Sequence, residues 1–265
     1  MLNQTIDKLH SLGLHAMAEM LASPPLGSAQ AELSLPEQMA LLVDREWDAR
    51  ENRRMATRLR NARLKQNAAV EDIDWQSPRG LDRGQILSLA GCHWIASHQH
   101  LIISGPTGVG KTFLACALGN RACRLGYSVT YRRVSRLLEE IALARADGSY
   151  RSLIQRLAKV QLLALDDWGL LALSAELAQD MLDLLEDRNG TGSTLIVTQI
   201  PVGSWHARIG DPTLADAILD RLVHGSHRIE LRGESMRKLR AQAAAQTTQE
   251  PELIPLSPSP QEAGR

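Results

Sequence analysis

The sequence has few aromatic residues and few cysteines. Aromatic side chains make up 3% of the 265 residues, and Phe113 is the single phenylalanine. Proteins that read single strands by base stacking need several exposed aromatics, so the composition disfavours that function. The three cysteines show neither a CxxC pair nor metal-ligand spacing. Such a sparse, odd set indicates reduced thiols in a reducing compartment.

Long hydrophobic runs and an excess of charge are also lacking. No run approaches the roughly 18 apolar residues that a membrane helix needs. The N-terminus does not resemble a signal peptide, because Asp7, Lys8 and His10 interrupt its apolar stretch. Basic and acidic residues number 30 each, so only the distribution of charge can indicate a nucleic-acid partner. We expect a cytoplasmic protein with no membrane partner.

The N-terminal part of the chain predicts helices. Apolar residues recur at helical spacing over residues 5–22, and Gly13 predicts a break into two short helices. Ser23 to Ser28 is typical of a linker. Ser34 and Glu37 fit a capping box. They predict a helix that runs to about residue 66, with an apolar side formed by Met39, Leu42, Val43 and Trp47.

Two groups of basic residues are candidates for contact with DNA phosphates. The first lies between residues 53 and 65 without an intervening acid and comprises Arg53, Arg54, Arg58, Arg60, Arg63 and Lys65. A solvated helix face explains such a run as well as a DNA surface does. The second group, just after a predicted strand, comprises Arg132, Arg133 and Arg136. We expect little base specificity from contacts of this kind.

From residue 100 onward, strand-like and helix-like segments alternate. Short apolar runs predict strands at 100–104, 127–131, 160–165, 194–198 and 227–231. Helix-like segments separate them near 110–125, 135–158, 174–189 and 213–223. This alternation is typical of an α/β fold with a parallel sheet. After about residue 241, low hydrophobicity and four prolines predict a disordered tail.

A phosphate-binding motif follows the first predicted strand. It fits G-x-x-x-x-G-K-[ST] and consists of Gly105, Pro106, Thr107, Gly108, Val109, Gly110, Lys111 and Thr112. Glycines let backbone amides point at phosphate oxygens, and the following helix adds its positive dipole end. Lys111 would reach the β- and γ-phosphates, and the Thr112 hydroxyl would ligate Mg²⁺. We therefore predict ATP and Mg²⁺ as cofactors, in a site that extends to Phe113.

Two further strand ends carry polar residues. Asp166 and Asp167 follow an apolar strand, where Asp166 can hold Mg²⁺ and Asp167 can polarise the attacking water. Asp167 could also be a helix cap or a solvent-facing turn residue. Thr198 and Gln199 end the fourth strand, where the carboxyl edge of the sheet faces the nucleotide.

Hydrolysis also needs positive charge at the γ-phosphate, and a neighbouring subunit can supply an arginine for it. Two arginines downstream of the fourth strand, Arg221 and Arg237, are candidates for this role. Composition selects neither of them, and each could instead form a surface ion pair.

Taken together, these motifs resemble the IstB-type transposition helper ATPases of the DnaC/IstB branch of AAA+ proteins. The resemblance covers residues 1 to about 240. The segments that carry it, besides the phosphate-binding motif, are 12–17, 79–83, 166–169, 197–201, 220–222 and 233–238. It implies a P-loop core with a five-stranded parallel sheet in the order 5-1-4-3-2 behind a small all-α domain. We expect an N-terminal domain over 1–80 that binds DNA or a partner, an ATPase domain over 81–240, and the tail over 241–265.

The resemblance also implies roles for the candidate residues. Lys111 and Thr112 become Walker A residues, and Asp166 and Asp167 become Walker B residues. Gln199, with Thr198, falls at sensor 1; Arg221 becomes the arginine finger acting in trans, and Arg237 becomes sensor 2. The catalytic glutamate usual in AAA+ proteins is the shorter Asp167 here, which fits a slow ATPase.

The function implied is that of a DNA-binding helper of an insertion-sequence transposase. The resemblance implies a homo-oligomer on duplex target DNA, with ATP at subunit interfaces, which prepares the target and activates the transposase. A replicative helicase loader of the DnaC type shares nearly the whole core, but it would bind a hexameric helicase and prefer single strands. A P-loop kinase for a small metabolite would need a hydroxyl acceptor and no DNA.

Overall fold

The computed structural model describes residues 1–23, 33–236 and 238. The predicted linker beyond Ser23, the predicted tail over 241–265 and the sensor 2 candidate Arg237 lie outside these residues. Gly13, with φ +72°, separates the first two helices, as predicted. The N-terminal helices are α1 (Leu2–Ser11), α2 (His15–Ala22) and α4 (Leu35–Ala62). Within this described part of the chain, no helix combines the length and apolarity needed to cross a membrane.

The C-terminal part is built on a sheet of five parallel strands. The strands are β1 (Leu101–Ser104), β2 (Val129–Arg133), β3 (Leu162–Trp168), β4 (Ser193–Thr198) and β5 (His227–Glu230). Their order, β2-β3-β4-β1-β5, confirms the predicted order 5-1-4-3-2 read from the opposite edge. Side chains of alternate residues enter separate apolar clusters on the two faces, so the sheet is buried on both sides.

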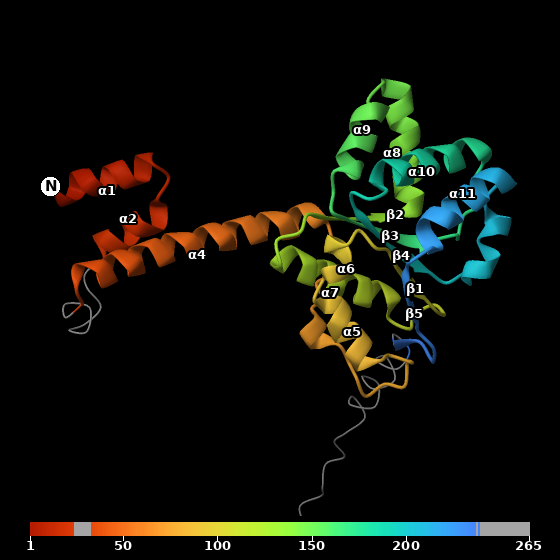
Figure 1. The fold of residues 1–265 in the computed structure, drawn as a ribbon, viewed down its shortest axis with the longest axis horizontal. Coiled ribbons are helices and arrows are strands. Elements are labelled where there is room, and N and C mark those ends of the chain that lie inside the picture. Colours follow the sequence, from red (N-terminus) through yellow and green to blue (C-terminus); the bar gives the residue numbers. More distant parts are fainter. Residues whose placement is uncertain (24–32, 237, 239–265) are drawn as a thin grey trace, which may run out of the picture.

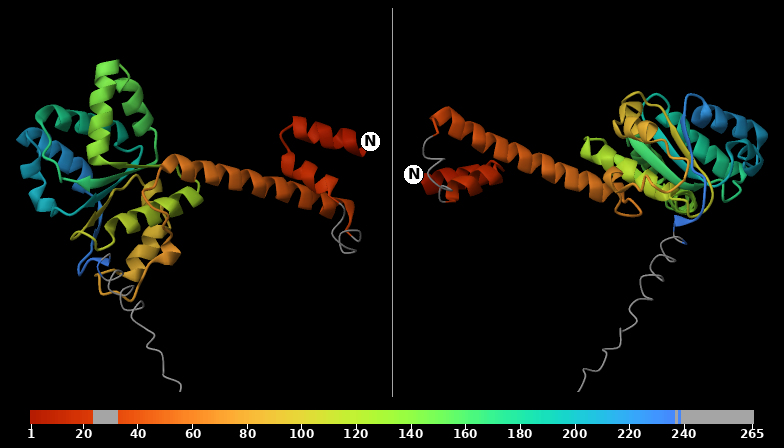
Figure 2. Two further views of the ribbon diagram at one scale, coloured as in Figure 1. Left: turned by 180° about the vertical axis from the view of Figure 1, so that it is seen from behind. Right: turned by 90° about the horizontal axis from the view of Figure 1, so that it is seen from below.

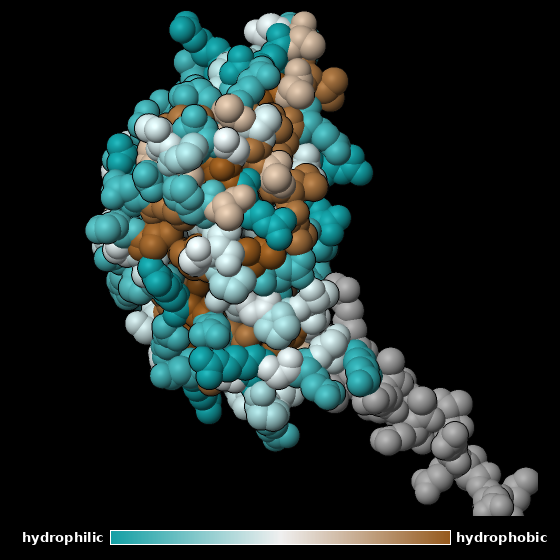
Figure 3. All heavy atoms as spheres, turned by 90° about the vertical axis from the view of Figure 1, so that its right-hand side faces the viewer, coloured by the Kyte–Doolittle hydropathy of each residue, from teal (hydrophilic) through white to brown (hydrophobic). Residues whose placement is uncertain are grey.

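Helices cover both faces of the sheet (Figure 1). One face packs against α5 (Arg83–Ala90), α6 (His93–Ala96) and α7 (Lys111–Arg124). The other packs against α8 (Val134–Asp147), α9 (Tyr150–Ala158), α10 (Ala175–Arg188) and α11 (Pro212–Val223). Short 3₁₀ turns complete the fold at η1 (Val70–Asp72), η2 (Val202–Ser204) and η3 (His206–Arg208). The face that points away from α1 and α2 mixes hydrophilic residues with hydrophobic areas (Figure 3).

Two predicted helices have different bounds in the structure. The segment 135–158 forms two helices rather than one, because Gly148 adopts φ +79° at the end of α8. The capping box of Ser34 and Glu37 is present, but α4 ends at Ala62 rather than near residue 66. Arg63 takes a left-handed conformation there, with φ +51°, which ends the helical hydrogen-bond pattern.

The long helix α4 projects from the core and carries α1 and α2 at its far end (Figures 1 and 2). At 1.5 Å per residue, its 28 residues span about 42 Å. On the predicted apolar side of α4, Met39, Val43 and Trp47 are 49%, 52% and 64% exposed, and Leu42 is partly buried. Helical periodicity places these residues on one side of α4, and the described part of the chain leaves most of that side exposed.

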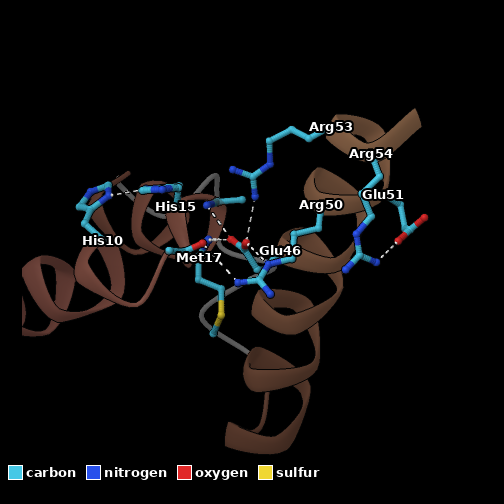
Figure 4. Close-up of polar contacts among 10 residues, drawn as sticks. His10, His15, Met17, Glu46, Arg50, Glu51, Arg53 and Arg54 are labelled. Atoms are coloured by element: carbon cyan, nitrogen blue, oxygen red, sulfur yellow. Dashed lines mark hydrogen bonds and ion pairs between the residues drawn. The ribbon is translucent and has the colours of Figure 1, made fainter. Parts of the chain in front are cut away.

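A buried carboxylate attaches α1 and α2 to α4. Glu46 Oε2 accepts hydrogen bonds from the backbone amides of Ala16 (2.8 Å) and Met17 (3.4 Å) at the start of α2. Its Oε1 pairs with Arg50 Nε at 2.9 Å and Arg53 Nη2 at 3.1 Å (Figure 4). Among the described residues, α1 buries none of its side chains and α2 buries only two alanines. Glu46 therefore supplies the polar cap that fixes α2 to α4.

We predict that Glu46→Ala releases α1 and α2 from α4 while the sheet domain stays folded. Hydrogen exchange of residues 2–22 should become faster, because two amides at the start of α2 lose their acceptor. The hydrogen bond from Arg50 lowers the pKa of Glu46. The attachment should therefore hold above the usual carboxyl pKa and weaken as the pH falls through the lowered value.

The matched control is Glu51→Ala, which removes an exposed carboxylate that pairs with Arg54 on the same helix. Its exchange pattern should match that of the wild type. Unchanged exchange over residues 2–22 in the Glu46 variant would show that other contacts hold these helices.

Candidate functional site

The loop between β1 and α7 requires glycine at two positions. Gly105 has φ +143°, and a Cβ atom there would lie 2.2 Å from the carbonyl oxygen of Leu231. Gly108 has φ +84°, and a Cβ atom there would lie 2.2 Å from Ser235 Oγ. Only glycine fits such positions. The loop therefore packs tightly against the chain after β5 and leads directly into the N-terminus of α7, which suits a bound anion.

Two side chains lie against this loop. Lys111 Nζ donates hydrogen bonds to the carbonyl oxygens of Gly105 and Pro106, both at 2.8 Å. Burial lowers the pKa of Lys111, while the charges of Asp166 and Asp167 raise it. The Gln199 side chain is hydrogen-bonded to Thr107 Oγ1, so the end of β4 meets the loop. The buried Thr198 hydroxyl instead donates to the carbonyl oxygen of Trp168 at 2.9 Å.

Asp166 lies at the centre of the site and is 1% exposed. Its Oδ2 accepts hydrogen bonds from Thr112 Oγ1, at 3.0 Å, and from the Tyr131 hydroxyl. Lys65 Nζ lies 3.6 Å from the same oxygen, and the backbone amide of Asp167 donates to Oδ1 at 2.9 Å. Burial and the hydrogen bond to Asp166 raise the pKa of Tyr131. The two predicted metal ligands, Thr112 and Asp166, are therefore adjacent.

These groups fit a nucleotide and a magnesium ion. A hydroxyl and a carboxylate are the oxygen ligands that Mg²⁺ prefers, and the glycine-rich loop with Lys111 suits phosphate groups. Beside the loop is a cavity of about 160 Å³. Its lining comes from the loop, from the segment before β1 and from the segment after β5: Gln66, Asp72, Asp74, Arg79, Gly108, Gly110, Lys111, Thr112, Phe113 and Met236.

Asp167 differs from Asp166 in its surroundings. Its backbone has φ +64°, which is uncommon outside glycine. Its Oδ2 accepts a hydrogen bond from Arg133 Nε at 3.0 Å, and the side chains of the pair are 36% and 50% exposed. Arg133, a candidate DNA contact at the end of β2, therefore pairs with the candidate water-activating acid.

Most of the other candidate DNA contacts also have partners within the chain. On α4, Arg53 pairs with Glu46 and Arg54 with Glu51, while Arg58 Nε donates to the carbonyl oxygen of Cys123 at 2.9 Å. Near β2, Arg132 pairs with Glu140 at 3.4 Å and Arg136 with Glu139 at 2.6 Å. Arg58 and Arg132 thus help to pack the structure, whereas Arg53, Arg54, Arg133 and Arg136 are at least half exposed.

Arg221 lies on α11. Its guanidinium pairs with Asp220 at 2.8 Å and with Glu186 of α10 at 3.7 Å. Among the described residues, these two carboxylates are its polar partners, so Arg221 does not contact the phosphate-binding loop of its own chain. Its side chain is 35% exposed.

Sequence reasoning missed three parts of the site. Local sequence patterns place Tyr131 only in a strand and Lys65 only in a basic run. The chain after β5 also reaches the loop, because the Met236 amide donates to the Gly108 carbonyl at 3.0 Å. Tyr131 could have been found from the strand order, since β2 lies beside β3 and Tyr131 pairs in register with Ala164, two residues before Asp166.

Comparison with known proteins identifies a family. Residues 7–244 match the family described as IstB-like ATP binding protein. An insertion-sequence ATP-binding protein of Sinorhizobium fredii is 51% identical over 234 residues, which cover 88% of this chain and 96% of that protein.

Two solved structures share the fold. The DnaI structure has a TM-score of 0.55 at 22% identity, and the alignment covers 62% of this chain and 91% of that one. The DnaC helicase loader has a TM-score of 0.51 at 19% identity, with 66% and 98% covered. The family match, the identity to an insertion-sequence protein and the shared fold lead to one conclusion: this chain belongs to the family of IstB-like ATP binding proteins.

Proposed function

We propose that this protein is an ATP-dependent DNA-binding helper of an insertion-sequence transposase. With ATP it assembles into an oligomer on duplex target DNA, remodels that DNA and activates the transposase. It hydrolyses ATP slowly to ADP and phosphate. The observation that carries the proposal is the adjacency of Thr112 and Asp166 beside the glycine-rich loop. The S. fredii relative, an insertion-sequence ATP-binding protein, supports the link to transposition.

Each group in the site has a defined part in hydrolysis. The amides of the loop and Lys111 would hold the phosphates, and Thr112 and Asp166 would hold Mg²⁺. Bound Mg²⁺ neutralises charge that develops on the phosphates. Asp167 orients the attacking water and accepts its proton, and Gln199 lies beside Thr107, where it can contact the γ-phosphate side of the loop.

The ion pair between Arg133 and Asp167 makes hydrolysis depend on DNA. While Arg133 binds the Asp167 carboxylate, that carboxylate is less available to a water molecule. DNA phosphates are strong competitors for an exposed arginine. When they take Arg133, Asp167 becomes free to act on water, so ATP is hydrolysed mainly after assembly on DNA.

Completion of the site requires a second subunit. Arg221 is directed to carboxylates of its own chain rather than to its own phosphate-binding loop. In an oligomer it would meet the γ-phosphate bound by a neighbour, as an arginine finger in trans does. Arg237, the sensor 2 candidate, follows Met236, whose amide is bonded to the loop at Gly108.

We predict that ATP and a non-hydrolysable analogue both promote large assemblies on duplex DNA, and that Lys111→Ala prevents them. Loss of the ammonium should weaken nucleotide binding by about tenfold or more, because hydrogen bonds to charged groups contribute about 1.5–3 kcal/mol. Electron microscopy and sedimentation with ADP, ATP and analogue give the measurement. The matched control is Lys159→Met, which changes an exposed lysine beyond α9.

Equal duplex affinity and equal oligomer size with and without nucleotide would contradict the proposal. A preference for single strands, together with co-purification of a hexameric helicase, would instead identify a helicase loader.

We also predict that Arg133→Ala raises the DNA-free rate of ATP hydrolysis by about two- to fivefold, which is the range for breaking a partly exposed ion pair. Stimulation by DNA should fall, and the salt dependence of DNA binding should become less steep. Steady-state phosphate release measures the rate, and a salt titration of DNA affinity measures the slope.

Arg136→Ala is the matched control, since Arg136 is nearby and pairs with Glu139 rather than with Asp167. It should alter the salt slope at most and leave the DNA-free rate unchanged. A DNA-free rate in the Arg133 variant equal to that of the wild type would rule out restraint of Asp167.

A further inference from the structure

Lys65 lies where the N-terminal helices join the ATPase core. Two residues before it, Arg63 ends α4 in a left-handed conformation. Leu64 then packs against α7 so closely that a Cβ atom on Gly119 would lie 3.0 Å from Leu64 Cδ2. Burial raises the pKa of the Cys116 thiol, and hydrogen bonds from the backbone amides of Gln66 and Lys65 oppose part of that rise. Cys116 lies one helical turn after Thr112 on α7. The backbone at Lys65 is thus fixed on the helix that carries the Walker A hydroxyl.

The side chain of Lys65 provides positive charge beside Asp166. Its Nζ lies 3.6 Å from Asp166 Oδ2, with side-chain exposures of 35% and 1%. The hydrogen-bond partners of that oxygen, Thr112 and Tyr131, are uncharged. Lys111 donates its hydrogen bonds to loop carbonyls instead. A buried carboxylate needs a charge partner or several hydrogen bonds, and Lys65 is the ion-pair partner of Asp166 among the described residues.

A divalent cation bound by Thr112 and Asp166 would lie close to the position of the Lys65 ammonium. Its ligands would be the Thr112 hydroxyl and the Asp166 carboxylate, and Lys65 approaches the very oxygen that Thr112 contacts. Two cations at one carboxylate oxygen repel each other, and water screens this repulsion only in part, because the Asp166 side chain is 1% exposed and that of Lys65 35% exposed. A bound metal therefore weakens the ion pair between Lys65 and Asp166, and that ion pair weakens metal binding.

We propose that Lys65 is an internal counter-cation of the Walker B carboxylate, and that binding of a metal–nucleotide complex displaces it and loosens the junction of α4 with the core. This inference rests on the binding of Mg²⁺ with ATP proposed above. Linkage makes the effect reciprocal: if metal binding weakens the junction, the intact junction weakens metal binding by the same factor.

The length of α4 amplifies a change at this junction. Lys65 lies at the base of a helix that spans about 42 Å, and α1 and α2 are attached at the far end (Figure 1). A rotation of about ten degrees at the base would displace the far end by roughly 7 Å. The position of α1 and α2 would therefore depend on the occupancy of a site at the other end of the helix.

The first test compares nucleotide affinity in Mg²⁺ and in EDTA for the full-length protein. A fluorescent non-hydrolysable ATP analogue serves as the probe. In Lys65→Met, the ratio of the two affinities should exceed that of the wild type by about three- to tenfold, in the range of coupling between contacting groups. Lys65→Arg, which keeps the charge, and Lys159→Met, which removes a distant exposed lysine, should behave as the wild type does.

Binding in EDTA provides an internal check of folding, because the phosphate-binding loop is unchanged in these variants. An unchanged ratio in Lys65→Met would overturn the inference while leaving the proposed function intact. A smaller ratio would overturn it too, since Lys65 would then contact the bound nucleotide. Absence of any Mg²⁺ effect in the wild type would overturn both.

The second test measures the distance between α1 and the core by double electron–electron resonance. Spin labels at Ser11→Cys and Ser152→Cys occupy exposed positions, whereas the native cysteines are buried. Labelled protein is diluted with unlabelled protein so that distances within one chain dominate. The Mg²⁺–nucleotide complex should shift the wild-type distribution, and Lys65→Met should show that shift without ligand. A wild-type distribution that stays the same at saturating ligand would contradict the loosened junction.

Discussion

The nucleotide site of this protein depends on the compensation of one buried charge. Asp166 ends a strand inside the sheet, where an unpartnered carboxylate would be costly. Its oxygens are satisfied by groups from four places in the chain: a hydroxyl of α7, a phenol of β2, an ammonium after α4 and the next backbone amide. The strand order makes this possible, because β3 lies between β2 and β4, and β1 follows β4. The strand order therefore brings the groups of the nucleotide site together around Asp166.

The two adjacent acids differ in exposure, and this difference suits the separate roles proposed for them. Asp166 is buried and surrounded by donors, which suits a fixed metal ligand. Asp167 is partly exposed and is held by an arginine that solvent can reach, which suits a group that is released on demand. Both acids are paired with cations of the same chain, Lys65 and Arg133. In the functions proposed above, bound ligands replace these internal ion pairs: the metal–nucleotide complex replaces the Lys65 pair, and DNA replaces the Arg133 pair.

The sequence allowed the sheet, its strand order and the position of the phosphate-binding loop to be predicted. The loop motif is contiguous, and the strands are short apolar runs, so both can be recognised locally; the strand order came from the family resemblance. Lys65 and Tyr131 could not be placed in the site from local patterns, because they reach Asp166 from positions 101 and 35 residues earlier in the chain. The exposed side of α4 shows a second limit of prediction from sequence. Helical spacing indicates which residues share a face of the helix, but it does not indicate whether other parts of the protein cover that face. Sequence alone also identifies Arg53 and Arg54 as basic residues without showing that their side chains pair with Glu46 and Glu51.

The most direct test of this account is the metal dependence of nucleotide binding in Asp166→Asn, measured by titration calorimetry with and without Mg²⁺. The amide keeps the size of the side chain and removes its charge. We expect this variant still to bind the nucleotide through the glycine-rich loop and Lys111, but with an affinity that Mg²⁺ does not increase. If Mg²⁺ strengthens binding in the variant as much as in the wild type, Asp166 is not the metal ligand and the arrangement described here does not form the catalytic site.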